Sequence, residues 1–148
     1  MAFQFSLDAI LHLRQSLERQ HELLLREANQ QVAAVQLRID HLNAELSERT
    51  NQEAMQLEST LSGAELQFMQ LCRSVLIGQR KGLEKRLATA QAIRDSCMTS
   101  FRQARQQREV LETLRQTQAQ AYRQNEARQS QRDLDDLLLL RRAHLRRR

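Results

Sequence analysis

Proline is absent from all 148 residues of this chain, and glycine occurs only three times. Tight turns draw heavily on both residues, and proline is also the strongest breaker of helices. With no tryptophan and one tyrosine, the chain also lacks the bulky side chains that usually fill a globular core. No stretch alternates apolar and polar residues as a strand would. These features predict an all-α fold made of long helices that pack in pairs.

Apolar residues recur at alternating spacings of three and four, which is the pattern of a coiled-coil seam. Two consecutive steps of four occur twice, ending at His21 and at Val32, and are expected to be stutters that relax the supercoil. The stripes are narrow, which favours a seam between two helices over a wide core. The first stripe is Leu13, Leu17, His21, Leu24, Ala28, Val32, Val35, Ile39, Leu42 and Leu46; the second is Leu83, Leu87, Ala90, Ile93, Cys97, Phe101, Ala104, Leu111 and Leu114; Ala54, Leu57, Leu61, Ala64, Phe68, Leu71 and Val75 keep the same spacing between them.

The net charge of +5 hides a difference between the two parts of the chain. Residues 1–58 carry nine acidic and five basic side chains, a balance of −4, and residues 59–148 carry nine acidic and eighteen basic, a balance of +9. Opposite charges are expected where two arms lie against each other with their flanking residues facing across. The chain is therefore predicted to be a long antiparallel two-helix coiled coil, or helical hairpin.

Two sites compete for the turn of this hairpin. In the first, Ser62 and Glu65 form a capping box around Gly63. The second, between Gly78 and Gly82, would give arms of nearly equal length, but it has no capping side chain, and an isolated glycine costs a helix only about 1 kcal/mol. We favour the first site. It gives one coiled-coil domain with a first helix over about 7–58, a tip at about 59–64, a second helix over about 64–141 and a basic tail over 141–148.

With the turn near residue 61, the first arm ends before it can cover the second. Residues 118–148, which we call the overhang, are then expected to project as a helix without a partner. A polar helix alone in water is marginally stable, so the overhang is expected to dock onto another molecule. Leu137 to Leu140 make it apolar on every side near its end, which suggests insertion in a socket.

No apparatus for catalysis is visible in the sequence. The four histidines are scattered, no glycine loop could cradle a phosphate, and the acidic residues lack calcium-loop spacing. Cys72 and Cys97 would lie roughly 37 Å apart on one helix, too far for a disulfide, and are expected to be reduced. We therefore predict a protein that is not an enzyme and has no cofactor and no metal.

No segment is predicted to cross or enter a membrane. The longest apolar run is four residues, far short of the roughly 20 that a spanning helix needs. The first residues lack the basic region and the apolar core of a secretory signal. A cytoplasmic protein is expected.

The two phenylalanines near the N-terminus need partners. Phe3 and Phe5 alternate with polar residues, so they are expected in an extended segment before a helix that Ser6 caps at Leu7. Phe5 can fold onto Ile10 or Leu11 as a hydrophobic staple, which leaves Phe3 without a partner.

Of the 23 basic residues 21 are arginine, and five of these lie in the last eight positions. Cations suit the end of a helix because of its dipole, so a solvated tail or a protein contact is expected. Binding to a polyanion is the alternative. No aromatic residues interleave with the arginines to stack on bases, so no nucleic acid is expected as a partner.

The chain resembles the flagellar FliJ proteins over nearly its whole length. The opening F-x-F-x-L is followed by a leucine-rich segment with an arginine and then a glutamate, and SGAELQF is similar to the glycine-containing tip of that family. Leu137 to Leu140 depart from the family's more polar ending, and Arg132 stands where lysine is usual. The matching positions are Phe3, Phe5, Leu7, Ile10, Leu11, Leu13, Arg14 and Glu18 in the first helix, and Arg108, Leu111, Glu112, Leu114, Arg115, Tyr122, Arg128, Gln131, Leu134, Asp135 and Asp136 in the second.

This resemblance implies a cytoplasmic component of the flagellar type III protein export apparatus, peripheral at the inner face of the cell membrane. A related protein from an injectisome would have the same role in its own export apparatus. Family members look like the central stalk of a rotary ATPase. The base of a monomeric hairpin enters the hexameric export ATPase, another part approaches the export gate in the membrane, and the protein escorts export chaperones. The residues expected at the ATPase are Phe3, Phe5, Arg14, Glu18, Arg115, Tyr122, Arg123, Arg128, Arg132 and Asp135.

Leu71, Val75 and Gln79 are weaker candidates for contact with the export gate, and the alternative is that Leu71 and Val75 are ordinary seam residues. The alternative function is a homodimeric coiled-coil scaffold, or a polyanion-binding protein that uses the arginine-rich C-terminus.

Overall fold

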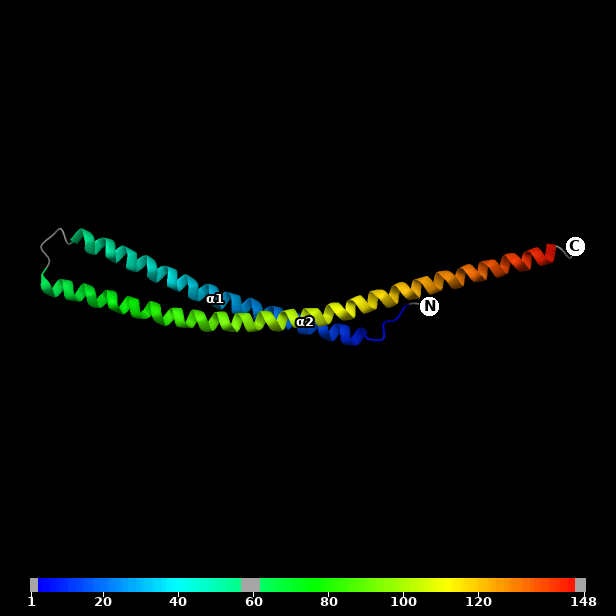
Figure 1. Cartoon of the computed structure of the whole chain (residues 1–148), viewed down its shortest axis with the longest axis horizontal. Coiled ribbons are helices and arrows are strands. Elements are labelled where there is room, and N and C mark those ends of the chain that lie inside the picture. Colours follow the sequence, from blue (N-terminus) through cyan, green and yellow to red (C-terminus); the bar gives the residue numbers. More distant parts are fainter. Residues whose placement is uncertain (1–2, 57–61, 146–148) are drawn as a thin grey trace. The chain divides into compact units, whose positions relative to one another are not determined.

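The computed structural model describes residues 3–56 and 62–145 of the chain. These ranges form two helices, α1 (Asp8–Gln56) and α2 (Gly63–Leu145), and contain no strand (Figure 1). Because α2 runs through Gly78 and Gly82 without interruption, the second predicted turn site is helical. Most of the favoured tip, residues 57–61, lies outside the described ranges.

The start of α2 is fixed by the predicted capping box, which the structure confirms. The Ser62 backbone N–H and its hydroxyl each donate a hydrogen bond of 2.9 Å to Glu65 Oε2, and the Glu65 N–H points back to Ser62 Oγ at 3.4 Å. The hydrogen bond from the Ser62 backbone, and then that from its hydroxyl, lowers the pKa of the Glu65 carboxyl. Reciprocal bonds of this kind satisfy N–H groups that the first helical turn leaves unpaired.

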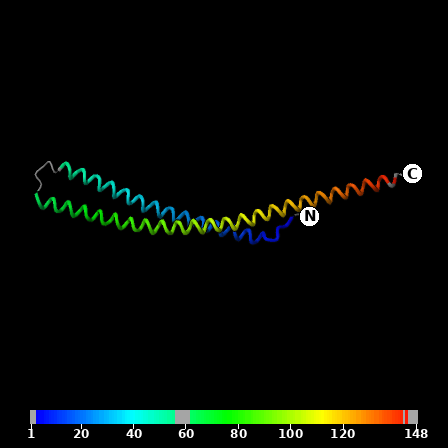
Figure 2. Tube along the Cα trace, viewed as in Figure 1, coloured from blue at the N-terminus to red at the C-terminus, as the bar shows by residue number. Residues whose placement is uncertain are grey.

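The chain divides into two compact units. Unit 1 joins Met1–Glu18 to Gln103–Arg148, and unit 2 is Arg19–Arg102. Within each unit a stretch of α1 lies beside a stretch of α2 that runs in the opposite direction (Figures 1 and 2). The predicted all-α antiparallel two-helix coiled coil is therefore confirmed.

The interior of unit 2 is a narrow apolar seam. Its buried side chains are Leu25, Ala28, Ile39 and Leu42 on α1 and Leu76 on α2. Their spacing on α1 keeps one edge of the helix against the facing helix. The predicted seam residues between them on α1 are half-buried, so most of the predicted register in this helix holds.

The predicted register is wrong at the start of α1. Leu13 and Leu24 are 58% and 52% exposed, while Leu11 and Leu25 are buried. Taking Leu11 as the seam position makes the steps alternate strictly between three and four through Val32, so the two predicted stutters disappear. The prediction from apolar spacing fails here because the polar residues Arg14 and Glu18 occupy the next two seam positions. The leucines that directly precede them were predicted to be the seam residues.

The predicted seam register is also wrong by one residue in the first part of α2. Phe68, Leu71 and Val75 are more than half exposed, and the inward positions are taken by half-buried Cys72 and buried Leu76. One residue turns a helix by about 100°, which is enough to move a side chain out of the seam. Four other predicted seam residues, Ala54, Ala64, Ile93 and Leu114, are also exposed, and Leu57 and Leu61 lie outside the described ranges.

Candidate protein-binding sites

The N-terminal segment packs against α2 through an aromatic contact. The ring of Phe3 lies 5.8 Å from the ring of Tyr122, with the two planes tilted by 49°. Phe5 is buried and is followed by a turn in which the Asp8 N–H donates to the Phe5 carbonyl at 3.2 Å. Phe3, which the sequence left without a partner, thus packs against the single tyrosine of the chain. We call the pair Phe3 and Tyr122 the aromatic clasp.

A polar layer joins the two helices of unit 1 about four turns of α2 away from Tyr122. Arg14 Nη1 donates a hydrogen bond of 2.7 Å to Gln107 Oε1, and Glu18 forms an ion pair with Arg108. The side chains of Glu18 and Arg108 are only 16% and 21% exposed. Water therefore screens this pair less than it would an ion pair on the surface.

Further charges extend the layer on one side of the coil. Arg108 also pairs with Glu112, and Arg115 Nη1 lies 3.8 Å from Asp8 Oδ1. Arg105 donates to Glu109 at 2.8 Å; this hydrogen bond lowers the pKa of the Glu109 carboxyl and raises the pKa of the Arg105 guanidinium. Arg14, Glu18 and Arg115, all predicted to meet a partner protein, thus have contacts within the chain.

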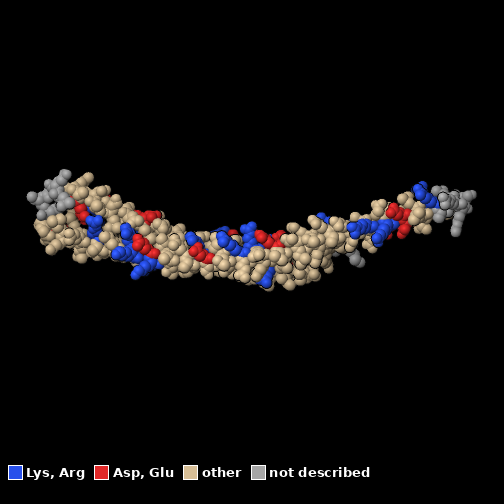
Figure 3. All heavy atoms as spheres, viewed as in Figure 1, with Lys and Arg blue, Asp and Glu red and all other residues tan. Residues whose placement is uncertain are grey.

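The overhang is exposed from Arg123 to Arg142, and no other described segment of unit 1 lies beside this stretch (Figure 1). Three of its predicted residues, Arg128, Arg132 and Asp135, are four and three positions apart and so share one face of the helix. Arg123 lies on a different face, about 140° from Arg128. Basic side chains gather along this part of α2 in the space-filling view (Figure 3).

Beyond this basic stretch the overhang carries exposed leucines. Leu134 is 57% exposed, and Leu137 to Leu140 are between 57% and 67% exposed. Four consecutive leucines point to all sides of a helix. They therefore form an apolar band around α2 and cannot all be covered by one flat surface.

The candidates for gate contact lie on the outer surface of unit 2. Leu71 and Val75 are 61% and 52% exposed, which excludes the alternative that they are seam residues. Phe68, at 67% exposure, precedes Leu71 by three positions and extends the same face. Gln79, also exposed, borders a shallow hollow with Gly82 and the side chains Arg38, Leu42, Leu83 and Arg86.

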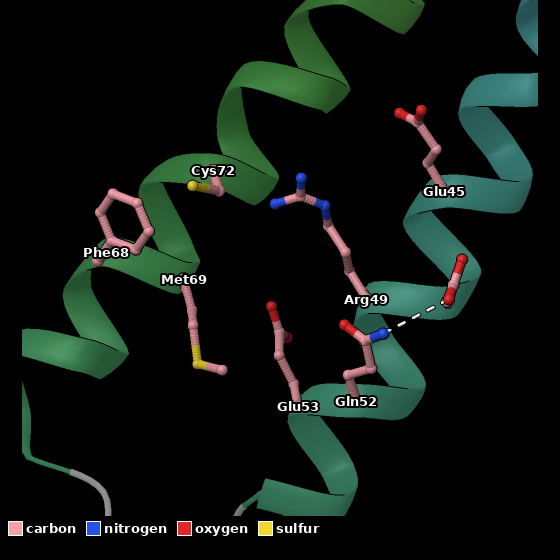
Figure 4. A pocket seen from close by; sticks show the side chains of 8 residues that line it. Glu45, Arg49, Gln52, Glu53, Phe68, Met69 and Cys72 are labelled. Atoms are coloured by element: carbon pink, nitrogen blue, oxygen red, sulfur yellow. Dashed lines mark hydrogen bonds between the residues drawn. The ribbon is translucent and has the colours of Figure 1, made fainter.

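A second hollow lies between the helices near the capping box (Figure 4). Arg49 reaches from α1 toward α2, while Met69 lies on the α2 side of the gap. Glu53 forms an ion pair of 3.8 Å with Arg73 across the two helices. The hollow thus has charged side chains on α1 and apolar side chains on α2.

The described residues hold no cluster of three or more histidine, cysteine or acidic side chains that could bind a metal ion. Cys72 and Cys97 are both free thiols. Neither helix, within the described ranges, combines the length and the hydropathy that crossing a membrane requires.

Sequence reasoning missed several residues that the structure brings into these sites. Gln107 and Asp8 pair with predicted residues, and Phe68 extends the exposed face of unit 2. A heptad count begun at Leu11 would have put Arg14 and Glu18 in the seam and indicated that they need polar partners across it. Nothing in the sequence of α1 alone identifies those partners.

One of three comparisons with known proteins finds a match for this chain. The family model described as flagellar FliJ protein matches residues 3–148. Neither the search of curated proteins nor the search of solved structures finds a match. Because the family model spans essentially the whole chain, this protein belongs to the flagellar FliJ family and is a component of flagellar protein export.

Proposed function

We propose that this chain is the non-catalytic central stalk of the flagellar type III export apparatus, and that it couples the hexameric export ATPase to the export gate. The exposure of residues 123–142 of the overhang on all sides is the observation that carries this proposal. A helix that is polar and unpaired gains little from remaining alone in water. A ring with a central opening is the kind of partner that can surround it, including the apolar band at Leu137 to Leu140.

The surface that meets the ATPase is proposed to consist of the overhang face, Arg128, Arg132 and Asp135, together with the aromatic clasp and Arg123. Arg14, Glu18 and Arg115 support it indirectly, since their contacts hold α1 against α2 below the overhang. Phe5 acts in the same way from its buried position. Guanidinium groups form strong, geometrically specific hydrogen bonds with carboxylates, which favours an acidic lining on the ring.

The face of Phe68, Leu71, Val75 and Gln79 is proposed to bind the export gate, and export chaperones are proposed as further partners. Exposed apolar side chains in a row on one helix are typical of a surface that another protein covers. Contact with the gate would hold the protein at the inner face of the cell membrane.

Binding to the purified export ATPase tests the proposal. The triple variant Arg128→Ala, Arg132→Ala and Asp135→Ala is expected to bind at least about tenfold more weakly, because each charge-assisted hydrogen bond contributes about 1.5–3 kcal/mol. The matched control is Lys81→Ala with Lys85→Ala, which removes exposed charges from unit 2 and is expected to bind like the wild type. Equal binding by both variants would count against the overhang as the ATPase site.

The alternative, a homodimeric scaffold, predicts a different mass in solution. A stalk hairpin is expected to scatter light as a monomer of 17.3 kDa. A stable dimer, or salt-dependent retention on DNA without ATPase binding, would favour the alternative.

A further inference from the structure

One side of the coil in unit 1 is apolar and uncharged. Ile10 and Leu13 on α1 are 45% and 58% exposed, and Val110 and Leu114 on α2 are 62% and 38% exposed. Leu17 is half-buried beside them. We call these five residues the uncharged flank.

The five residues lie on the same side of the coil because of their register. Ile10 and Leu13 directly precede the seam positions Leu11 and Arg14, and Val110 directly precedes Leu111. Leu17 and Leu114 precede seam positions in the same way. When two helices run in opposite directions, the positions that directly precede the seam point to the same side of the pair.

Charged side chains avoid this side. Over residues 8–18 and 103–118, every charged residue and His12 lie at a seam position or on the other side, where Arg108–Glu112 and Arg105–Glu109 form ion pairs. The remaining residues around the uncharged flank are small or amide side chains: Ser16, Gln103, Gln106, Gln107, Thr113 and Thr117. The Arg14 guanidinium reaches this side from its seam position, where it is bonded to Gln107. A partner on this flank therefore meets no other charged group of these two stretches, and it is expected to present an uncharged surface itself.

The width of the apolar stripe indicates a helix as the occupant. A two-helix coil needs only its two seam positions to be apolar, whereas helices in larger bundles carry a third apolar position beside the seam. Here both α1 and α2 carry that third position, and on the same side. A third helix lying along α1 and α2 would complete the bundle.

The size of the uncharged flank decides between a second copy of the chain and another protein. Its exposed apolar surface amounts to about two whole side chains, far below the roughly 800 Å² that each partner buries in a stable complex. A dimer held by this flank alone would not be stable. The occupant is therefore a helix from a partner that is also bound elsewhere on unit 1.

We propose that the uncharged flank docks one amphipathic helix of the export ATPase through an uncharged stripe of aliphatic side chains about two turns long, the length that residues 10–17 of α1 span. The inference rests on the proposed function, because the ATPase is proposed to bind the overhang of the same unit. Binding to the ATPase then has two contributions. The arginine face of the overhang supplies the salt-sensitive part, and the uncharged flank supplies a part that salt does not weaken.

The test uses the full-length chain with Leu13→Glu and, separately, Val110→Glu. Both positions are exposed, and no charged residue lies three or four positions away on the same helix, so neither new carboxylate gains an ion pair along its helix. The control is Gln116→Glu, which adds the same charge on the other side of α2. Thermal melts followed by far-UV circular dichroism are expected to match the wild type for all three variants.

Binding to the purified export ATPase is then measured at low and high salt. Leu13→Glu and Val110→Glu are expected to bind at least about tenfold more weakly at both salt concentrations, because a carboxylate would be buried without a partner. Gln116→Glu is expected to stay within about twofold of the wild type.

Binding by both flank variants within twofold of the wild type would overturn the inference while leaving the proposed function intact. A wild-type dimer that either substitution converts to a monomer would overturn the inference and would also favour the homodimeric scaffold over the proposed function. Failure of the wild-type chain to bind the ATPase at all would overturn both.

Discussion

The ion pair between Glu18 and Arg108 leads to a specific prediction about the stability of the folded chain. It crosses the seam of unit 1, and both side chains are mostly shielded from water. Arg108→Leu removes the cross-helix partner of Glu18 and leaves a carboxylate in the seam. Glu18→Leu is milder, because Arg108 keeps its pair with Glu112 on its own helix. Arg108→Leu is therefore expected to destabilise the chain more than Glu18→Leu.

The magnitude follows from the partial burial. Two unit charges about 4 Å apart attract by about 4 kcal/mol at an effective dielectric constant of about 20, and the cost of removing them from water offsets much of this. Breaking an exposed pair costs about 0–1 kcal/mol and breaking a fully buried one about 3–5. We expect about 2 kcal/mol for Arg108→Leu, or a melting temperature lower by roughly 4–8 °C.

The double variant Glu18→Leu with Arg108→Leu is the decisive measurement. It replaces the ion pair by two leucines that extend the apolar seam, and such replacements are commonly neutral or stabilising. Urea unfolding followed by far-UV circular dichroism gives the free energies of unfolding. The control is Arg26→Leu, whose pair with Glu22 is exposed and is worth at most about 0.5 kcal/mol. A double variant as unstable as Arg108→Leu, or Arg108→Leu no worse than the control, would refute the reasoning.

Two further predictions concern the aromatic clasp and the capping box. Phe3→Ala is expected to weaken the tyrosine band in the near-UV circular dichroism spectrum while the far-UV spectrum stays unchanged, because Tyr122 is the only tyrosine and the chain has no tryptophan; an unaltered band would contradict the clasp. Glu65→Gln is expected to destabilise the chain at neutral pH, with a difference that vanishes as pH falls through the lowered pKa of Glu65, since the carboxylate stabilises the fold only while it is ionised. Urea unfolding of both proteins at several pH values measures this, and a difference independent of pH would argue against the cap.

The sequence was sufficient for the helices and their pairing because these depend on features that repeat along the chain. The lack of proline, the spacing of apolar residues and the opposite charge of the two arms all point to one antiparallel hairpin. The capping box was also predictable, since Ser62 and Glu65 interact locally and need no distant partner.

The exact register was not predictable in the same way, because polar residues occupy part of the seam. A search for apolar periodicity passes over Arg14 and Glu18 and selects Leu13, which the structure leaves exposed. For the same reason the sequence did not predict the uncharged flank, because apolar spacing assigned its leucines to the seam. Contacts such as Phe3 with Tyr122 join residues far apart in sequence, and they follow only once the register is known.

The polar seam of unit 1 explains why one register is chosen at all. A seam made only of leucine and alanine tolerates shifts by a heptad and parallel pairing of two copies, whereas a few polar seam residues specify one arrangement at some cost in stability. Arg14 meets Gln107 and Glu18 meets Arg108 only in the observed antiparallel register, which is also the register that brings Phe3 to Tyr122. We infer that the double leucine variant would keep or gain stability yet hold this register less strictly. Its tyrosine band would then weaken even as its resistance to urea is maintained, a combination that loss of folding cannot produce.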